Sequence, residues 1–239
     1  MKKTNNKKIS GFDQTDLDYA ADVIPMAYRS EIALLGNEKA KLVEKYIIST
    51  YKYLDAFPQK ALEEAKKAVK VVSRLAVVRE MLGLAAYKSG DWSLAIRELK
   101  TARRLNGLSD YLPIIADSYR GLGQPMQVFE IAISPEATSL PLPTHIEMSI
   151  VLAGAYSDIG KFGPALKTLK HEMARRGLST ELKLRLIEAQ AVLLEVEGRQ
   201  VEANKIWSIT EPIRQSIDDA ALSELIVYDI GEDESSGDE

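Results

Sequence analysis

The sequence contains no cysteine, and this absence removes several kinds of chemistry. Without thiols the chain can form no disulfide, bind no metal through thiolates and use no cysteine nucleophile. Only two histidines occur, His145 and His171, and neither stands in a spacing typical of a metal or catalytic site. We therefore expect a structural or solvent-exposed role for both. The sequence predicts a protein that is not an enzyme, with no cofactor and no bound metal.

Long apolar runs are also missing. Every uninterrupted apolar run is far shorter than the roughly 20 residues that a membrane-spanning helix needs. The basic start, MKKTNNKKIS, is followed by no apolar segment, so we expect no signal peptide. These absences predict a cytoplasmic protein with no membrane partner.

Charge is concentrated at the two ends of a chain whose formal net charge is −4. Four lysines lie in the first eight residues and six acidic residues in the last eleven, which leaves the body nearly neutral. A nucleic-acid-binding protein usually carries a basic stripe on its folded body, so nucleic acid is not favoured as a partner. Two groups of basic residues keep a weak RNA-contact surface open as an alternative: Arg97, Lys100, Arg103 and Arg104, and Lys167, Lys170, Arg175 and Arg176.

The most informative feature present is residues 82–105, LGLAAYKSGDWSLAIRELKTARRL. Its apolar and small residues follow the spacing of two amphipathic helices joined by a Gly-Asp turn. Gly83 and Ala95 are small enough for the two helix backbones to approach closely, and Leu99 and Ala102 fill the seam between them. The pattern resembles the tetratricopeptide repeat (TPR), a helical hairpin that stacks into solenoids.

This motif recurs near the family's period of about 34 residues. A small or β-branched residue opens each second helix: Ala61, Ala95, Val128, Ala165 and Ala203. A turn glycine precedes the last four by five residues: Gly90, Gly123, Gly160 and Gly198. The family's early tryptophan is absent, and Arg79 stands at its place in the second repeat. The resemblance implies an all-α fold, a right-handed superhelical TPR solenoid of about five helix-turn-helix repeats.

The hydrophobic periodicity and the positions of glycine and proline divide the chain into four parts. We predict a disordered basic tail over 1–20, a capping helix within 21–37, the solenoid over 38–214, and a short helix with an acidic disordered tail over 215–239. Within the solenoid, the predicted helix pairs are 38–55 with 58–72, 74–89 with 91–106, 109–122 with 124–133, 144–159 with 161–176, and 180–197 with 199–214. Thr144 and Glu147 have the spacing of a capping box at the start of the fourth pair.

A narrower resemblance rests on SRLAVVREMLGLAAYKSGDWSLAIRELKTARRLNG, followed by LPIIADSYRGLG and an acidic C-terminus. These segments look like a group of uncharacterised soluble TPR proteins of actinobacteria. The resemblance implies a bacterial cytoplasmic protein and adds little about function.

In the TPR family, the first helices of successive repeats line a concave groove that binds ligands. Transferring the family's contact positions gives a candidate partner-binding groove: Glu80, Leu84, Tyr87, Lys88, Asp117, Arg120, Glu147 and Asp158. Stacking is expected to bring Tyr87, Lys88 and Arg120 close together. Mixed charge with aromatic anchors suits an extended or helical peptide.

The function predicted from this groove is a non-catalytic adaptor that binds a protein or peptide partner. The alternative is an accessory or regulatory subunit of an enzyme or RNA-processing complex that uses the convex basic face. Nothing in the sequence indicates the oligomeric state.

Overall fold

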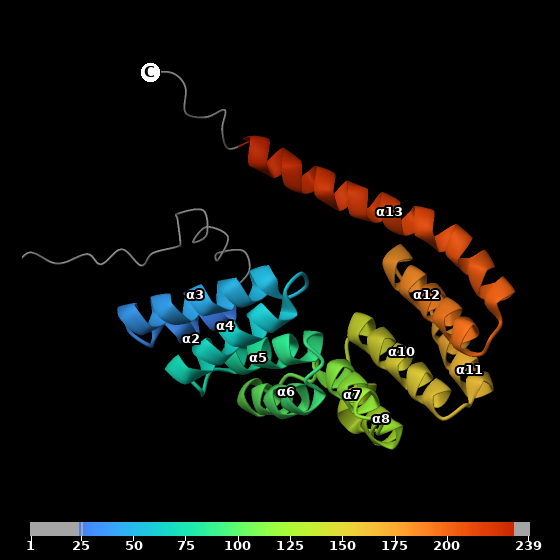
Figure 1. Ribbon diagram of the computed structural model, residues 1–239, viewed down its shortest axis with the longest axis horizontal. Helices are drawn as coiled ribbons and strands as arrows, with labels where there is room; N and C mark the ends of the chain where they lie inside the picture. Colours follow the sequence, from blue (N-terminus) through green and yellow to red (C-terminus); the bar gives the residue numbers. More distant parts are fainter. Residues whose placement is uncertain (1–23, 25, 232–239) are drawn as a thin grey trace, which may run out of the picture. The chain divides into compact units, whose positions relative to one another are not determined.

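The computed structural model describes residue 24 and residues 26–231 of the 239-residue chain. The predicted tail 1–20 and the last eight residues of the predicted acidic tail lie outside the described residues. Across the described part of the chain, every regular element is a helix and none is a strand (Figure 1). The all-α prediction is confirmed.

The helices belong to two compact units, Met1–Gln124 and Pro125–Glu239. The first unit contains α2 (Met26–Ala33), α3 (Asn37–Tyr53), α4 (Pro58–Val71), α5 (Ala76–Lys88), α6 (Trp92–Asn106) and α7 (Leu112–Gly121). The second contains α8 (Pro125–Ala132), α9 (Pro135–Thr138), α10 (Leu142–Asp158), α11 (Phe162–Met173), α12 (Thr180–Val196) and α13 (Gln200–Gly231).

Both helices of each of the five predicted pairs are present. Four of them pack as hairpins inside one unit: α3 with α4, α5 with α6, α10 with α11, and α12 with α13 (Figure 1). The third pair, α7 and α8, falls on the boundary between the units, and each helix belongs to its own unit.

The residue that opens each second helix is fully buried in every repeat. Ala61, Ala95, Val128, Ala165 and Ala203 all have 0% exposure. A larger side chain at these positions would hold the second helix away from its neighbours, because helix axes pack only about 8–10 Å apart. The positions at which these residues recur in the sequence are therefore the positions at which the helices pack together.

The turns between paired helices depend on glycine where the sequence predicts it. Gly90, Gly123, Gly160 and Gly198 have φ values of 81°, 69°, 71° and 86°. This left-handed region is open to glycine and strained for most other residues. The first hairpin instead turns through Phe57, with Pro58 at the first position of α4. Proline fits there because the first helical N–H has no partner within the helix.

Arg79, at the place of the missing tryptophan, forms an ion pair inside the hairpin. Its Nη1 donates to Oε2 of Glu98 at 2.6 Å, and its Nε donates to the carbonyl of Ser73 at 2.8 Å. Glu98 is a buried residue of α6 and also accepts a hydrogen bond from Arg97. A charged pair thus joins α5 to α6 where the family pattern uses an aromatic ring.

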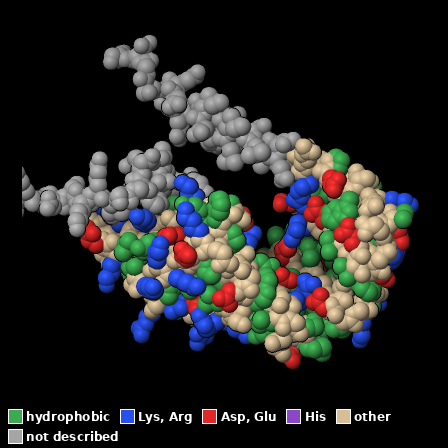
Figure 2. All heavy atoms as spheres, in the orientation of Figure 1, with side chains coloured by type: hydrophobic (Ala, Val, Ile, Leu, Met, Phe, Trp, Pro, Cys, Tyr) green, Lys and Arg blue, Asp and Glu red, His purple; other side chains and the backbone are tan. Residues whose placement is uncertain are grey.

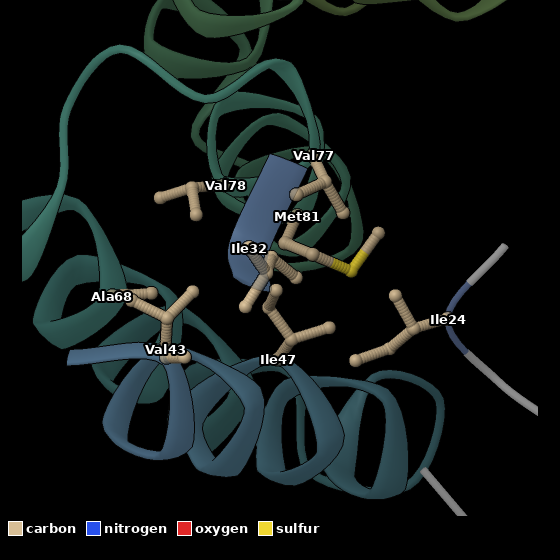
Figure 3. Packing of buried hydrophobic residues seen from close by; sticks show 9 residues of the cluster. Ile24, Ile32, Val43, Ile47, Ala68, Val77, Val78 and Met81 are labelled. Atoms are coloured by element: carbon tan, nitrogen blue, oxygen red, sulfur yellow. The ribbon is translucent and has the colours of Figure 1, made fainter. Parts of the chain in front are cut away.

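The helix α2 packs onto the core of the first unit through Ile32. This side chain is fully buried and points among Val43 and Ile47 of α3 and Val77 and Met81 of α5 (Figure 3). The N-terminal helix therefore covers part of the first helices of the first two repeats.

Two local predictions were wrong. The helix α10 begins at Leu142, with Pro141 as the N-terminal cap and no side-chain cap hydrogen bond, so Thr144 and Glu147 do not form a capping box. At the other end, α13 does not stop near residue 214 but continues unbroken to Gly231, through Pro212.

The close approach at Gly83 leads to a prediction about stability. A Cβ atom there would lie 2.6 Å from Cγ and Cδ2 of Leu99, which is fully buried and has little room to move. We expect Gly83→Ala to lower the free energy of unfolding by about 1–3 kcal/mol, as overpacking does. Urea denaturation followed by circular dichroism measures this change.

Gly163→Ala is the matched control. A Cβ at Gly163 would meet nothing within 4 Å, and its helical backbone accepts alanine. Its stability should be unchanged or slightly higher. Equal free energies of unfolding for Gly83→Ala and Gly163→Ala would show that α5 and α6 are loosely packed at Gly83.

Candidate functional site

The residues predicted for the groove are divided between the two units. The first unit holds Glu80, Leu84, Tyr87, Lys88, Asp117 and Arg120, and the second holds Glu147 and Asp158. Each group is therefore described within its own unit.

Three of the predicted residues are joined by hydrogen bonds. The Tyr87 hydroxyl, at the end of α5, donates to Oδ2 of Asp117 on α7 at 2.6 Å. Arg120 Nη1 donates to Oδ1 of the same carboxylate at 2.8 Å. Asp117 thus holds an aromatic and a guanidinium group in a fixed relation. The ring of Tyr87 also packs edge-on against Trp92, with 5.4 Å between the ring centroids.

Lys88 does not join this hydrogen-bonded group but forms an ion pair with a residue that follows α3. Its Nζ lies 2.6 Å from Oδ1 of Asp55, in the turn after α3. The two side chains are 46% and 80% exposed, and such pairs contribute only about 0–1 kcal/mol. We call Tyr87, Lys88, Asp117 and Arg120 the Tyr87 patch. Each cation of the patch is accompanied by an aspartate.

Glu80 lies in a hydrogen-bonded cluster with the N-terminal helix. Its Oε2 accepts from the hydroxyl of Tyr28 on α2 at 3.0 Å and from the hydroxyl of Tyr111 at 2.8 Å. The amide of Asn106 donates to both phenol oxygens, at 3.3 and 2.8 Å. Glu80 therefore anchors α2 to the second repeat.

Burial changes the titration of this cluster. It raises the pKa of Glu80, and the hydrogen bonds from Tyr111 and Tyr28 oppose that shift without cancelling it. Burial likewise raises the pKa of Tyr28 and of Tyr111, and it raises the pKa of Tyr51 to about 12, with help from the charge of Glu80. Burial thus disfavours the charged form of each of these groups.

The remaining predicted residues lie apart from these groups. Leu84 is half-buried and packs on the core that α2 covers. Glu147 accepts two hydrogen bonds from Arg185 of α12, at 3.0 and 2.8 Å. Asp158 is the exposed last residue of α10.

The basic residues of α6 do not form a bare cationic surface. Arg97 donates to the buried Glu98, and Lys100 Nζ donates to the hydroxyl of Tyr119 at 2.8 Å. On the face in view, Figure 2 shows lysine and arginine side chains of the first unit mixed with acidic and hydrophobic ones.

Sequence reasoning missed a cleft of about 740 Å³ in the second unit. Apolar side chains form much of its lining, among them Met148, Leu152 and Tyr156 of α10, and both histidines of the chain contribute to it. The cleft borders α8, which ends at Ala132 and is the shortest of the second helices. The prolines of 134–143 could have indicated a shortened helix, but not the cleft beside it.

A charged trio lies at the edge of this cleft. Glu172 is 4% exposed, and its Oε2 pairs with Nε of Arg175 without the alignment of a hydrogen bond. Nη2 of Arg175 lies 3.0 Å from Nε2 of His145. Nε2 of His145 also lies 3.5 Å from Oε2 of Glu172. The trio fixes side chains but presents no activated nucleophile.

Metal ligands do not gather anywhere in the part of the chain that the structure describes. No group of three His, Asp or Glu side chains there is placed to hold an ion. Among the same residues, no helix combines the length and the apolar character that crossing a membrane requires.

Comparison with known proteins identifies the fold but no family. No protein-family model matches the chain, and no curated protein matches it. Among solved structures, it is similar to nearly identical TPR-like repeats of a kinesin light chain-like protein from Podosopora anserina. A variant of those repeats aligns with a TM-score of 0.54 at 18% identity, over 77% of this chain and 99% of the other. A second structure aligns with a TM-score of 0.51 at 18% identity, over 73% and 96%.

At this identity the likeness shows the fold alone. The chain has an all-α, TPR-like repeat fold, as the sequence predicted. The comparisons give no support to the resemblance to actinobacterial proteins.

The raised pKa of Glu80 predicts a pH dependence of stability. Because this pKa is higher in the folded protein than in the unfolded chain, folding takes up a proton between the two values. The free energy of unfolding should therefore fall as pH rises through that range. Glu80→Gln keeps an acceptor for both phenols and removes the charge, so it should abolish this part of the slope and be at least as stable as the parent at neutral pH.

Urea denaturation at a series of pH values tests this expectation. Glu38→Gln, at an exposed position in the first turn of α3, is the control and should keep the parent's slope. An unchanged slope in Glu80→Gln would mean that another group sets the pH dependence.

Proposed function

We propose that this chain is a non-catalytic adaptor that binds a protein or peptide partner at the Tyr87 patch. TPR-like repeat folds generally serve as protein-interaction scaffolds, and their stacked helices present extended surfaces for this purpose. The observation that carries the proposal is the hydrogen-bonded arrangement of Tyr87, Asp117 and Arg120 across α5 and α7.

The patch favours a partner segment with an apolar anchor beside an acidic residue. Tyr87 is half-buried and orients its ring against Trp92, so it offers a rigid apolar surface with little entropy left to lose on binding. Lys88 can exchange its exposed Asp55 for a partner carboxylate at small cost. Tyrosine and arginine are also the residue types that most often dominate binding energy at interfaces.

The other parts of the proposal rest on the sequence alone. A cytoplasmic location, the absence of catalysis and the lack of a cofactor stay predictions. The alternative role, as an accessory or regulatory subunit of an enzyme or RNA-processing complex, requires basic residues such as those of α6 to contact the partner. The pairing of Arg97 and Lys100 within the first unit does not favour it.

The test is selection of binders from a random peptide library displayed on phage, with the full chain as bait. We expect enrichment of peptides that carry an aliphatic or aromatic residue near Asp or Glu. In titrations of an enriched peptide, Tyr87→Ala should weaken binding by at least about 1 kcal/mol, or about fivefold in Kd. Lys88→Ala should weaken it by less, because it removes only an exposed ion pair.

Arg104→Ala is the control, since Arg104 is an exposed cation of α6. It should leave Kd unchanged, and circular dichroism should show all three variants folded. Loss of binding in Arg104→Ala with Tyr87→Ala silent would move the binding surface to α6 and support the alternative role.

A further inference from the structure

The cleft beside α10 and α11 has features of a ligand site that the proposed function does not use. Its volume of about 740 Å³ lies within the range of about 300–1,000 Å³ that is typical of small-molecule pockets. Such pockets combine mostly apolar walls with a few polar groups that orient the ligand. The lining of this cleft has that composition, and all of its residues belong to the second unit.

The cleft changes from polar to apolar along its length. The helices α10 and α11 form an antiparallel hairpin, so the start of α10 lies beside the end of α11 (Figure 1). The lining residues of α10 run from His145 to Tyr156, a span of about 16 Å at 1.5 Å per residue. His145 contacts Arg175 at one end, whereas Leu152, Tyr156 and Pro164 line the other. A ligand that fits this cleft therefore has a polar end and an apolar body.

A buried hydroxyl lies next to the polar end of the cleft. Ser149 lies one helical turn after His145 on α10. His171 of α11 lies one turn before Arg175, so the antiparallel hairpin brings it to the level of Ser149. Ser149 is 7% exposed and forms no side-chain hydrogen bond with any residue that the structure describes, although buried hydroxyls are normally hydrogen-bonded. Its hydroxyl is therefore available to a ligand in the cleft.

The unpaired basic groups of the lining favour an anion. Lys167 and His171 lie four residues apart on α11, so they share one face of that helix. Neither forms an ion pair or a hydrogen bond with the described residues of the chain. The acidic residue of the lining, Glu172, is 4% exposed and already pairs with Arg175. A cation in the cleft would meet only this paired acid, whereas an anion can pair with Lys167.

We propose that the cleft binds a small aliphatic carboxylate. The carboxylate accepts hydrogen bonds from Ser149 and His171, and Lys167 supplies the opposite charge from the rim. The hydrocarbon chain lies along Leu152 and the ring of Tyr156, at the apolar end of the cleft. This site belongs to the second unit, so its ligand binds independently of a partner at the Tyr87 patch of the first unit.

Isothermal titration calorimetry of the full chain with decanoate tests the proposal. We expect saturable binding of one decanoate per chain. Acetate keeps the carboxylate without the chain, and decylammonium keeps the chain with the opposite charge. Both should bind at least about tenfold more weakly, because one lacks the buried apolar surface and the other lacks the attraction to Lys167.

Two variants test the polar contacts, each with a matched control. Ser149→Ala removes the hydroxyl at nearly constant volume and should raise Kd for decanoate about tenfold, as the loss of a hydrogen bond to a charged group does. Ser157→Ala, on the same helix and outside the lining, should leave Kd unchanged. Lys167→Glu should raise Kd about fivefold at low salt and by less at high salt. Lys170→Glu, at an exposed position of α11 outside the lining, is its control.

Circular dichroism checks that each variant is folded. Should Ser149→Ala lower the stability, the exposed Lys167→Glu still decides the result. Tyr87→Ala should leave decanoate binding unchanged, which separates this site from the Tyr87 patch.

Four results would overturn the proposal. The first is no saturable binding of decanoate, and the second is equal binding of decylammonium. The third is an unchanged Kd in both Ser149→Ala and Lys167→Glu, which would place decanoate elsewhere, such as in the apolar furrow of about 240 Å³ between α12 and α13. The fourth is a library-selected peptide that displaces decanoate and loses affinity in Lys167→Glu, which would make the cleft a peptide site.

Discussion

The fold depends on how closely two helices approach at one small residue in each repeat. At Ala95 the second helix has no side chain beyond Cβ, and at Gly83 the first helix has none at all, so Leu99 can lie directly over the backbone of α5. The same buried position recurs at Ala61, Ala165 and Ala203. A hairpin of this kind cannot bury its apolar faces alone, and stacking on neighbours completes the burial.

Local features of the sequence determined what could be predicted about the fold. A turn glycine five residues before a small residue fixes both the end of one helix and the crossing of the next, so the helix pairs followed from spacing. Helix ends that lack such a turn glycine were harder to predict. Pro212 does not end α13 because the helix continues through it, and Pro141, not Thr144, stands at the start of α10.

The residues of the candidate site could be chosen from the sequence, but the hydrogen bonds and ion pairs that they form could not be predicted. The family pattern brought Tyr87 and Arg120 to neighbouring helices, and the structure joins them. It could not reveal that Tyr87 contacts Asp117 or that Lys88 contacts Asp55, since these partners lie in other repeats and depend on side-chain reach. The cleft near His145 could not be predicted for a related reason, because its lining comes from several helices of the second unit.

The attachment of α2 has a consequence for biosynthesis. Tyr28 and Tyr111, whose hydroxyl oxygens lie 3.4 Å apart, are 83 residues apart in the chain. At about 5–20 residues per second, about 4–17 s separate the synthesis of the two tyrosines. Ile32 meets Val43 and Ile47 of α3 early in this interval, and Val77 and Met81 of α5 later. The hydrogen bonds of Tyr28 with Asn106 and Tyr111 can therefore form only after the first two repeats have been synthesised, so the attachment of α2 is completed well after its own synthesis.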